Sequence, residues 1–188
     1  MKHSGTQTLE TSRLILRRFC IEDASAMFHN WASDPAVTRY LTWPTHTDES
    51  ITRALLEDWV PRYRDERYYH WAIVPKGTRN LPIGSIAVVA LDDQVEKATI
   101  GYCIGRNWWH QGITSEALSA VIAFLLYDVG INRVEAYHDP RNPHSGDVMK
   151  KCGMIYEGTF RQSDRNNQGI CDASWYGILK NSRYEKTA

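Results

Sequence analysis

One apolar stripe constrains the fold of this chain more than any other feature of its sequence. Six apolar residues recur at the spacing of a helix that is apolar on a single face: Leu118, Val121, Ile122, Leu125, Leu126 and Val129. A helix of this kind has to bury its apolar face against another layer of structure. The spacing therefore predicts a helix that is packed inside a layered domain and ends at Gly130.

The segment in front of this helix predicts a phosphate-binding turn. A strand pattern over residues 98–104 leads into a turn that contains Gly112, and the helix follows. The first N–H groups of a helix lack partners within it and lie at its positive end, so they bind phosphate well. The residues alone leave a simpler interpretation open, in which Gly112 is only a turn residue and Thr114 or Ser115 only a cap.

The rest of the pattern indicates an α+β protein with a single domain, which we place at residues 8–182. About seven strands and about four helices are expected, and the three strands between residues 70 and 104 suggest an antiparallel meander. The expected strands are residues 14–19, 70–74, 83–91, 98–104, 133–137, 155–161 and 173–179. Besides the helix of the apolar stripe, the expected helices are residues 22–31, 48–61 and 144–151.

The charge balance excludes a general electrostatic attraction to nucleic acid or to an anionic membrane. The 188 residues include 22 basic and 22 acidic side chains, so any anionic ligand must be held by local cations. The longest apolar run, residues 120–127, is far shorter than the roughly 20 residues that cross a bilayer. The amino terminus is polar, and we expect a cytoplasmic protein that binds neither nucleic acid nor membrane.

The spacing of cysteine and histidine argues against disulfides and against a metal site. The four cysteines stand singly, and we expect reduced thiols that serve packing: Cys20, Cys103, Cys152 and Cys171. His110, His138 and His144, even with Asp139, lack the paired spacing of metal ligands, so no metal is expected.

Residues 100–117 resemble the pyrophosphate loop of the GNAT N-acetyltransferases. They are most similar to the branch of the ribosomal-protein N-terminal acetyltransferases RimJ and RimL, which reads Trp-Gly-x-Gly-x-Ala-Thr-Glu-Ala. The matching residues are Trp109, Gly112, Glu116 and Ala117. His110 stands where that branch has glycine and Thr114 where it has alanine, so this loop is bulkier than usual.

The resemblance extends over nearly the whole chain, in the order and spacing of the family. Its further blocks are residues 9–17, 83–86, 132–136, 142–145, 151–154 and 157–161. It implies the GNAT fold, with a mixed and mostly antiparallel sheet. In that fold two central parallel strands, here residues 98–104 and 133–137, splay apart and admit the pantetheine arm of acetyl-CoA.

Acetyl-CoA is the co-substrate that the resemblance implies. The backbone around Cys103 and Ile104 would hold the pantetheine amides and polarise the thioester carbonyl. Arg106 and either Lys150 or Lys151 would supply cations for the phosphates. The expected acetyl-CoA-binding residues are Cys103, Ile104, Gly105, Arg106, His110, Gln111, Gly112, Ile113, Thr114, Ser115, Asn142, Ser145 and Lys150.

In this family the acceptor amine attacks the thioester directly, without an acyl-enzyme. Asn142 and Ser145 match the Asn-x-x-Ser of the branch, where the Asn binds pantetheine and the Ser hydroxyl lies near the leaving sulfur. Other branches place a tyrosine as general acid where this chain has Met149, which cannot donate a proton. Ser145 is therefore the expected catalytic hydroxyl, unless it only caps the short helix.

The general base is the other catalytic residue to assign. Members of the branch often carry glutamate where this chain has Thr99, so that carboxylate is missing. Asp164 matches an acidic residue proposed as base in RimL-like enzymes and is the expected base. Two alternatives stay open: Asp164 is a solvated loop charge, or a chain of water molecules accepts the proton. No base lies beside Cys103 in the sequence, and we do not expect it to be a nucleophile.

The resemblance implies an N-acetyltransferase that acts on the α-amino group of a protein or peptide. An α-amine with a pKa of about 7.7 to 8.0 loses its proton more readily than a lysine at about 10.4, which mildly favours such acceptors. Acetylation of a small amine (an amino acid, a polyamine or an aminoglycoside) is the alternative, and a non-catalytic acetyl-CoA-binding module is a second one. Homodimers are common in the family, and the sequence leaves that state open.

Overall fold

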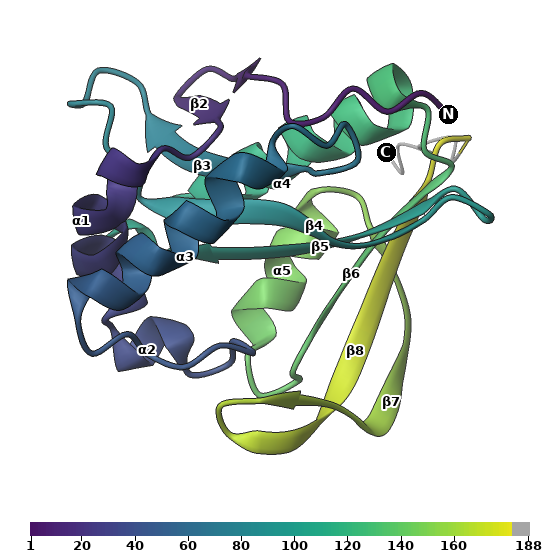
Figure 1. The fold of residues 1–188 in the computed structure, drawn as a ribbon. Helices are drawn as coiled ribbons and strands as arrows, with labels where there is room; N and C mark the ends of the chain where they lie inside the picture. The colour runs from purple at the N-terminus through teal and green to yellow at the C-terminus, as the bar shows by residue number, and fades with distance from the viewer. Residues whose placement is uncertain (182–188) are drawn as a thin grey trace.

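A computed structural model describes residues 1–181 of the chain, so the expected domain end at residue 182 lies outside the described residues. Eight strands form one sheet in the order β1-β2-β3-β4-β5-β6-β8-β7, with helices on both faces (Figure 1). The strands are β1 (Leu9–Glu10), β2 (Leu14–Arg17), β3 (His70–Pro75), β4 (Gly84–Asp92), β5 (Lys97–Ile104), β6 (Arg133–His138), β7 (Ile155–Asn166) and β8 (Gly169–Leu179). The α+β class is confirmed, and the strand beyond the expected seven is the two-residue β1.

The central strands pair as the sequence predicts. β3, β4 and β5 form an antiparallel meander, in which Ser85 lies opposite both Ala72 and Cys103. β5 and β6 are parallel, and they pair only from Lys97 opposite Arg133 to Thr99 opposite Glu135. The rest of β5 runs on to Ile104 beside β4 alone. This early end of the parallel ladder confirms the splayed pair of central strands.

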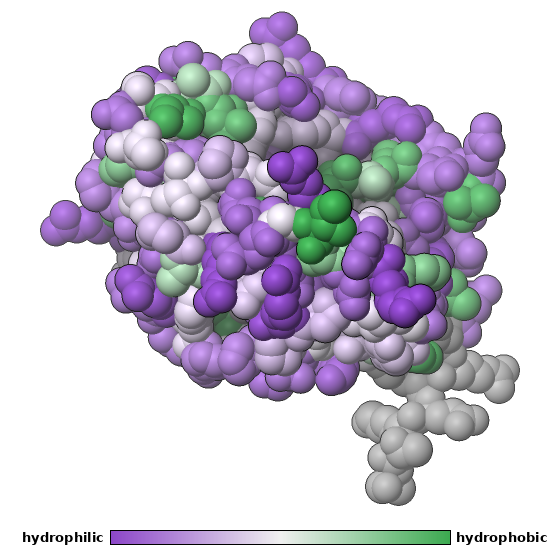
Figure 2. Space-filling model, turned by 90° about the horizontal axis from the view of Figure 1, so that it is seen from below, coloured by the Kyte–Doolittle hydropathy of each residue, from purple (hydrophilic) through white to green (hydrophobic). Residues whose placement is uncertain are grey.

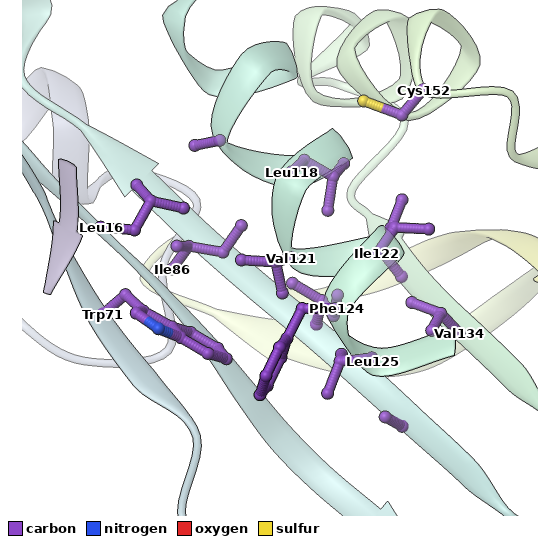
Figure 3. Close-up of a cluster of buried hydrophobic side chains, with 14 of the residues drawn as sticks. Leu16, Trp71, Ile86, Leu118, Val121, Ile122, Phe124, Leu125, Val134 and Cys152 are labelled. Carbon is purple, nitrogen blue, oxygen red and sulfur yellow. The ribbon is translucent and has the colours of Figure 1, made fainter. Parts of the chain in front are cut away.

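The apolar stripe covers one face of the sheet. It forms α4 (Ile113–Ala123) and a π-helical continuation (Phe124–Val129), and Gly130 ends the segment with a φ of 85°. Figure 3 shows Leu118, Val121, Phe124 and Leu125 pointing from this segment toward Trp71 and Ile86 of the sheet. α5 (Pro143–Lys151) adds Met149 to the same core. The predicted helix is thus confirmed, with burial of its stripe as the stabilising force.

The other face of the sheet carries the helices from the first part of the chain. α1 (Ala24–Met27), α2 (Pro35–Thr38) and α3 (Glu49–Arg62) lie here, and a second core joins Trp31, Leu56 and Val74. The helix expected at residues 22–31 is instead a 3-10 turn (Ile21–Asp23), α1 and a π-turn (Phe28–Ala32). This helical segment ends at Ala32, and Asp34 starts the next helix: its carboxylate caps α2 by accepting from the N–H of Ala36 at 2.9 Å.

The β7–β8 hairpin forms a bridge to the loop between α2 and α3. At the hairpin turn, Asn167 donates hydrogen bonds from Nδ2 to the carbonyl oxygens of Thr38 at 2.8 Å and Trp43 at 2.7 Å. Its backbone N–H donates to the carbonyl of Leu41 at 3.1 Å. The hairpin and α2 lie at the bottom of Figure 1, and the same side viewed from below is largely hydrophilic, with small separate hydrophobic areas (Figure 2). Within the described residues, no helix has the length and apolarity that a membrane span requires.

Candidate active site

The turn before α4 leaves the start of that helix without a side-chain cap. β5 ends at Ile104, a 3-10 turn (Arg106–Trp108) follows, and Gly112 occupies the N-cap position of α4 with a φ of 73°. No side chain caps the helix at Gly112, so Thr114 and Ser115 do not act as its N-cap. The backbone N–H groups of the first turn are therefore available to an anion at the positive end of the helix.

The carboxylate in the first turn of α4 is bound by the three residues that precede β2. Glu116 accepts hydrogen bonds from the hydroxyls of Thr11 at 2.6 Å and Ser12 at 3.0 Å. It also accepts from the backbone N–H of Arg13 at 2.9 Å and from its guanidinium Nε at 2.6 Å. Burial alone would raise the pKa of Glu116, but these hydrogen bonds outweigh it and lower the pKa to about 2.

Arg13 places a cation beside the turn, which the sequence did not reveal. Its Nη1 donates to the carbonyl of Gln111 at 3.0 Å, and a Cβ added to Gly112 would lie 3.6 Å from its Nη2. Two of the expected phosphate ligands are engaged elsewhere. Arg106 pairs with Asp34 at 3.0 Å, and Lys150 pairs with Asp147 at 3.5 Å on the exposed side of α5.

The first turn of α5 lies beside the end of β5, on the face that α4 covers. The ring centroids of His110 and His144 are 4.8 Å apart, so the turn before α4 meets the start of α5. Asn142 is the N-cap residue of α5 and makes no side-chain capping bond, so its amide is not used by the helix. Ser145 donates its hydroxyl proton to the Tyr102 hydroxyl at 3.1 Å. The expected residues of the turn, Asn142 and Ser145 are thus brought to one region.

A cavity of about 330 Å³ lies on the opposite face of the sheet, and the expected base lines it. Alternation along β5 sets Thr99 and Cys103 on this face and Tyr102 on the other. Asp164 therefore lies across the sheet from Ser145. The lining residues are Val89, Ala90, Thr99, Tyr137, Ser163, Asp164, Ala173 and Trp175.

The floor of this cavity is aromatic. The rings of Tyr137 and Trp175 lie on adjacent strands with their centroids 4.5 Å apart. Burial raises the pKa of Tyr137, and the negative charge of Asp164 raises it further. Tyr137 therefore stays protonated near neutral pH. Asp164 supplies the carboxylate of the cavity beside an aromatic surface.

A second carboxylate lies behind Thr99. The Thr99 hydroxyl donates to Oε1 of Glu135 at 3.0 Å, on the neighbouring strand. Glu135 is 4% exposed and is also bound by Lys97 at 3.0 Å and Arg133 at 2.9 Å. Burial would raise its pKa, but these partners lower it, so the carboxylate stays ionised and is a weak base. The oxygen of Thr99 keeps lone pairs for a donor in the cavity.

Cys103 is unsuited to nucleophilic attack. Burial raises the pKa of its thiol to about 12, so the thiolate is scarce at neutral pH. Among the described residues, no group of three or more His, Cys, Asp or Glu side chains is arranged to hold a metal ion.

Fold and sequence together define the class. Residues 13–155 match the family described as the acetyltransferase (GNAT) domain, and the chain belongs to this family. It is an N-acetyltransferase, and its splayed strand pair and uncapped helix start are the features expected of that class.

The chain is similar to several N-acetyltransferases. Over 92% of this chain and 96% of the relative, it is 34% identical to the uncharacterized N-acetyltransferase YoaA of Bacillus subtilis. A stretch of 59 residues, 31% of this chain and 30% of the relative, is 37% identical to the [ribosomal protein uS5]-alanine N-acetyltransferase of Escherichia coli. The structure of a RimL ribosomal α-N-protein acetyltransferase in complex with coenzyme A has the same fold, with a TM-score of 0.81 at 20% identity over 92% of this chain and 98% of that one.

Arg13→Gln is expected to weaken coenzyme A binding about tenfold, because it removes the guanidinium beside Gly112 that we expect to contact the phosphates. Isothermal titration with coenzyme A measures this. Arg106→Gln should have a smaller effect because Arg106, unlike Arg13, has no atom within 4 Å of a Cβ placed at Gly112. Arg62→Gln, which removes an exposed charge from α3, is the control. If Arg13→Gln bound coenzyme A as tightly as wild type and Arg106→Gln bound it more weakly, Arg106 rather than Arg13 would be assigned to the phosphates.

Proposed function

We propose that the protein transfers the acetyl group of acetyl-CoA to the α-amino group of a protein or peptide. The observation that carries this proposal is the charge pattern of the 330 Å³ cavity, whose lining includes one carboxylate, Asp164, and no lysine or arginine. The similarity to a ribosomal-protein acetyltransferase supports the same acceptor class and a cytoplasmic location.

The cavity lining discriminates among amine acceptors. A free amino acid would bring its own carboxylate next to Asp164, with no lysine or arginine in the lining to receive it. A polyamine or an aminoglycoside carries several cations and would need several carboxylates. The terminal amine of a peptide carries one positive charge, and the carboxyl group of the first residue is part of an uncharged peptide bond. Asp164 and the aromatic floor of Tyr137 and Trp175 suit such a monocation.

In this proposal the donor is held from the other face of the sheet. The residues of the turn, from His110 to Ser115, bind the diphosphate through backbone N–H groups, with Arg13 beside them. The backbone at Cys103, Ile104 and Gly105 and the amide of Asn142 hold the pantetheine arm. Arg106 and Lys150 or Lys151 remain candidates for the outer phosphate. The relative that is described as a complex with coenzyme A supports this assignment of the donor.

The proposed reaction makes only modest demands on its general base, Asp164 or water, and on the hydrogen-bond donor Ser145. The amine nitrogen attacks the thioester carbonyl carbon, the C–S bond breaks, and its electron pair leaves on sulfur. Asp164, or water that reaches the cavity, takes the proton of the amine. Ser145 donates a hydrogen bond to the departing thiolate, which is fairly stable because a free thiol has a pKa of about 8.5.

An acceptor panel tests the proposal. Release of coenzyme A is measured with peptides that have a free amino terminus, with the same peptides blocked at that terminus, with free amino acids and with spermidine. We expect turnover only with the free peptides, and mass spectrometry should place the acetyl group on the α-nitrogen. Turnover with spermidine or with amino acids alone would assign the small-amine alternative, and tight binding of acetyl-CoA without any transfer would contradict the proposal.

A further inference from the structure

Ser145 is held by a tyrosine that comes from the sheet. The Tyr102 hydroxyl donates to the backbone carbonyl of Ser145 at 2.8 Å and accepts the Ser145 hydroxyl proton at 3.1 Å. One phenol thus contacts both the main chain and the side chain of the same residue. These two hydrogen bonds join the second half of β5 to the first turn of α5, where β5 has no pairing with β6.

The position of this phenol compensates for the side chain that α5 lacks. Met149, one helical turn after Ser145, is 1% exposed and offers no donor. Tyr102, on β5, brings a hydroxyl to the first turn of α5, at Ser145. Its ring packs partly buried against the main core, which fixes where the hydroxyl lies.

We propose that Tyr102 is a positioning residue that orients the Ser145 hydroxyl toward the sulfur of coenzyme A. This inference rests on the proposed function. When the C–S bond breaks and its electron pair moves to sulfur, the Ser145 O–H turns from Tyr102 to the thiolate. The single phenol proton can then turn from the Ser145 backbone carbonyl to the Ser145 hydroxyl oxygen, which strengthens the hydrogen bond from serine to sulfur.

Tyr102 acts in this arrangement by hydrogen bonding and keeps its proton. Burial raises the pKa of Tyr102, although the hydrogen bond from Ser145 lowers it in part. A tyrosinate is therefore unfavourable at this place, and the thiolate gains its proton from solvent after release. The proton of the attacking amine leaves on the opposite face, by way of Asp164 or water.

The Tyr102→Phe variant tests the inference, because it removes the hydroxyl and keeps the ring. We expect kcat to fall about tenfold with little change in the KM for acetyl-CoA. Ser145→Ala should cause a similar fall, and the double variant should be no slower than Ser145→Ala alone, because Tyr102 works through Ser145. Tyr156→Phe, which removes an exposed phenol from β7, is the control.

A second measurement does not depend on turnover. The thiol of bound coenzyme A is titrated by the ultraviolet absorbance of its thiolate, and its pKa should rise by about one unit in Tyr102→Phe and in Ser145→Ala. That shift in an enzyme that acetylates none of the tested peptides would support the role of Tyr102 while the proposed function fails. An unchanged thiol pKa, or losses in kcat that multiply in the double variant, would overturn the inference.

Discussion

Replacing Gly112 by alanine is expected to lower kcat/KM for acetyl-CoA about 100-fold while the protein stays folded. The backbone of Gly112 has a φ of 73°, where a side chain costs about 1 to 2 kcal/mol. The new methyl group would also lie 3.6 Å from Nη2 of Arg13, in the space in front of the helix start where a phosphate would be held. Binding of coenzyme A and steady-state kinetics measure the loss.

Gly77 provides a matched control for this substitution. Its φ is 75°, and a Cβ added there meets nothing within 4 Å. Gly77→Ala should therefore lose a similar amount of stability in thermal unfolding and none of its affinity for coenzyme A. Equal affinity in Gly112→Ala and wild type would show that the diphosphate lies elsewhere.

Asp164→Asn is expected to lower kcat about 100-fold at pH 7 with a peptide acceptor. The amine must be neutral to attack, and the amide cannot take its proton. Above pH 8 an α-amine is largely deprotonated in solution, so the difference from wild type should narrow as the pH rises. The pH profile of kcat for both proteins measures this effect.

Asp172→Asn is the control for Asp164→Asn, because it removes the same charge from the same hairpin without altering the cavity. Its carboxylate accepts the backbone N–H of Gln162 at 2.8 Å, a bond that an asparagine oxygen can keep. An Asp164→Asn enzyme as fast as wild type at pH 7 would mean that water removes the proton.

Much of the fold could be predicted because its determinants are local. The stripe from Leu118 to Val129 and the turn at Gly112 are periodic or conformational signals, and both elements form where the sequence places them. The sequence does not predict β1, because two residues are too few to show the alternation of a strand. Pro61 was expected to mark the end of α3, which ends one residue later at Arg62. A proline so close to the end disturbs only the last turn.

The candidate site was less predictable because its contacts join residues far apart in sequence. The hydrogen bonds from Arg13 to Glu116 and to the carbonyl of Gln111 connect the segment before β2 to α4 and the turn in front of it. No spacing in the sequence predicts these contacts. The matching of Thr99 with Glu135 depends on the register of β5 against β6. In both cases the residue types were visible in the sequence, and only the fold shows which of them meet.

The hydrogen bonds from Asn167 to the carbonyl oxygens of Thr38 and Trp43 bear on how the two faces of the sheet can vary independently. These hydrogen bonds join two segments more than a hundred positions apart in the chain on the face of the sheet that carries the cavity, whereas the turn before α4 lies on the other face. Under the proposed function, substitutions in either segment would alter the acceptor side of the sheet and leave the acetyl-CoA side unchanged. Enzymes with this arrangement could then differ in their acceptor substrates through loop substitutions alone.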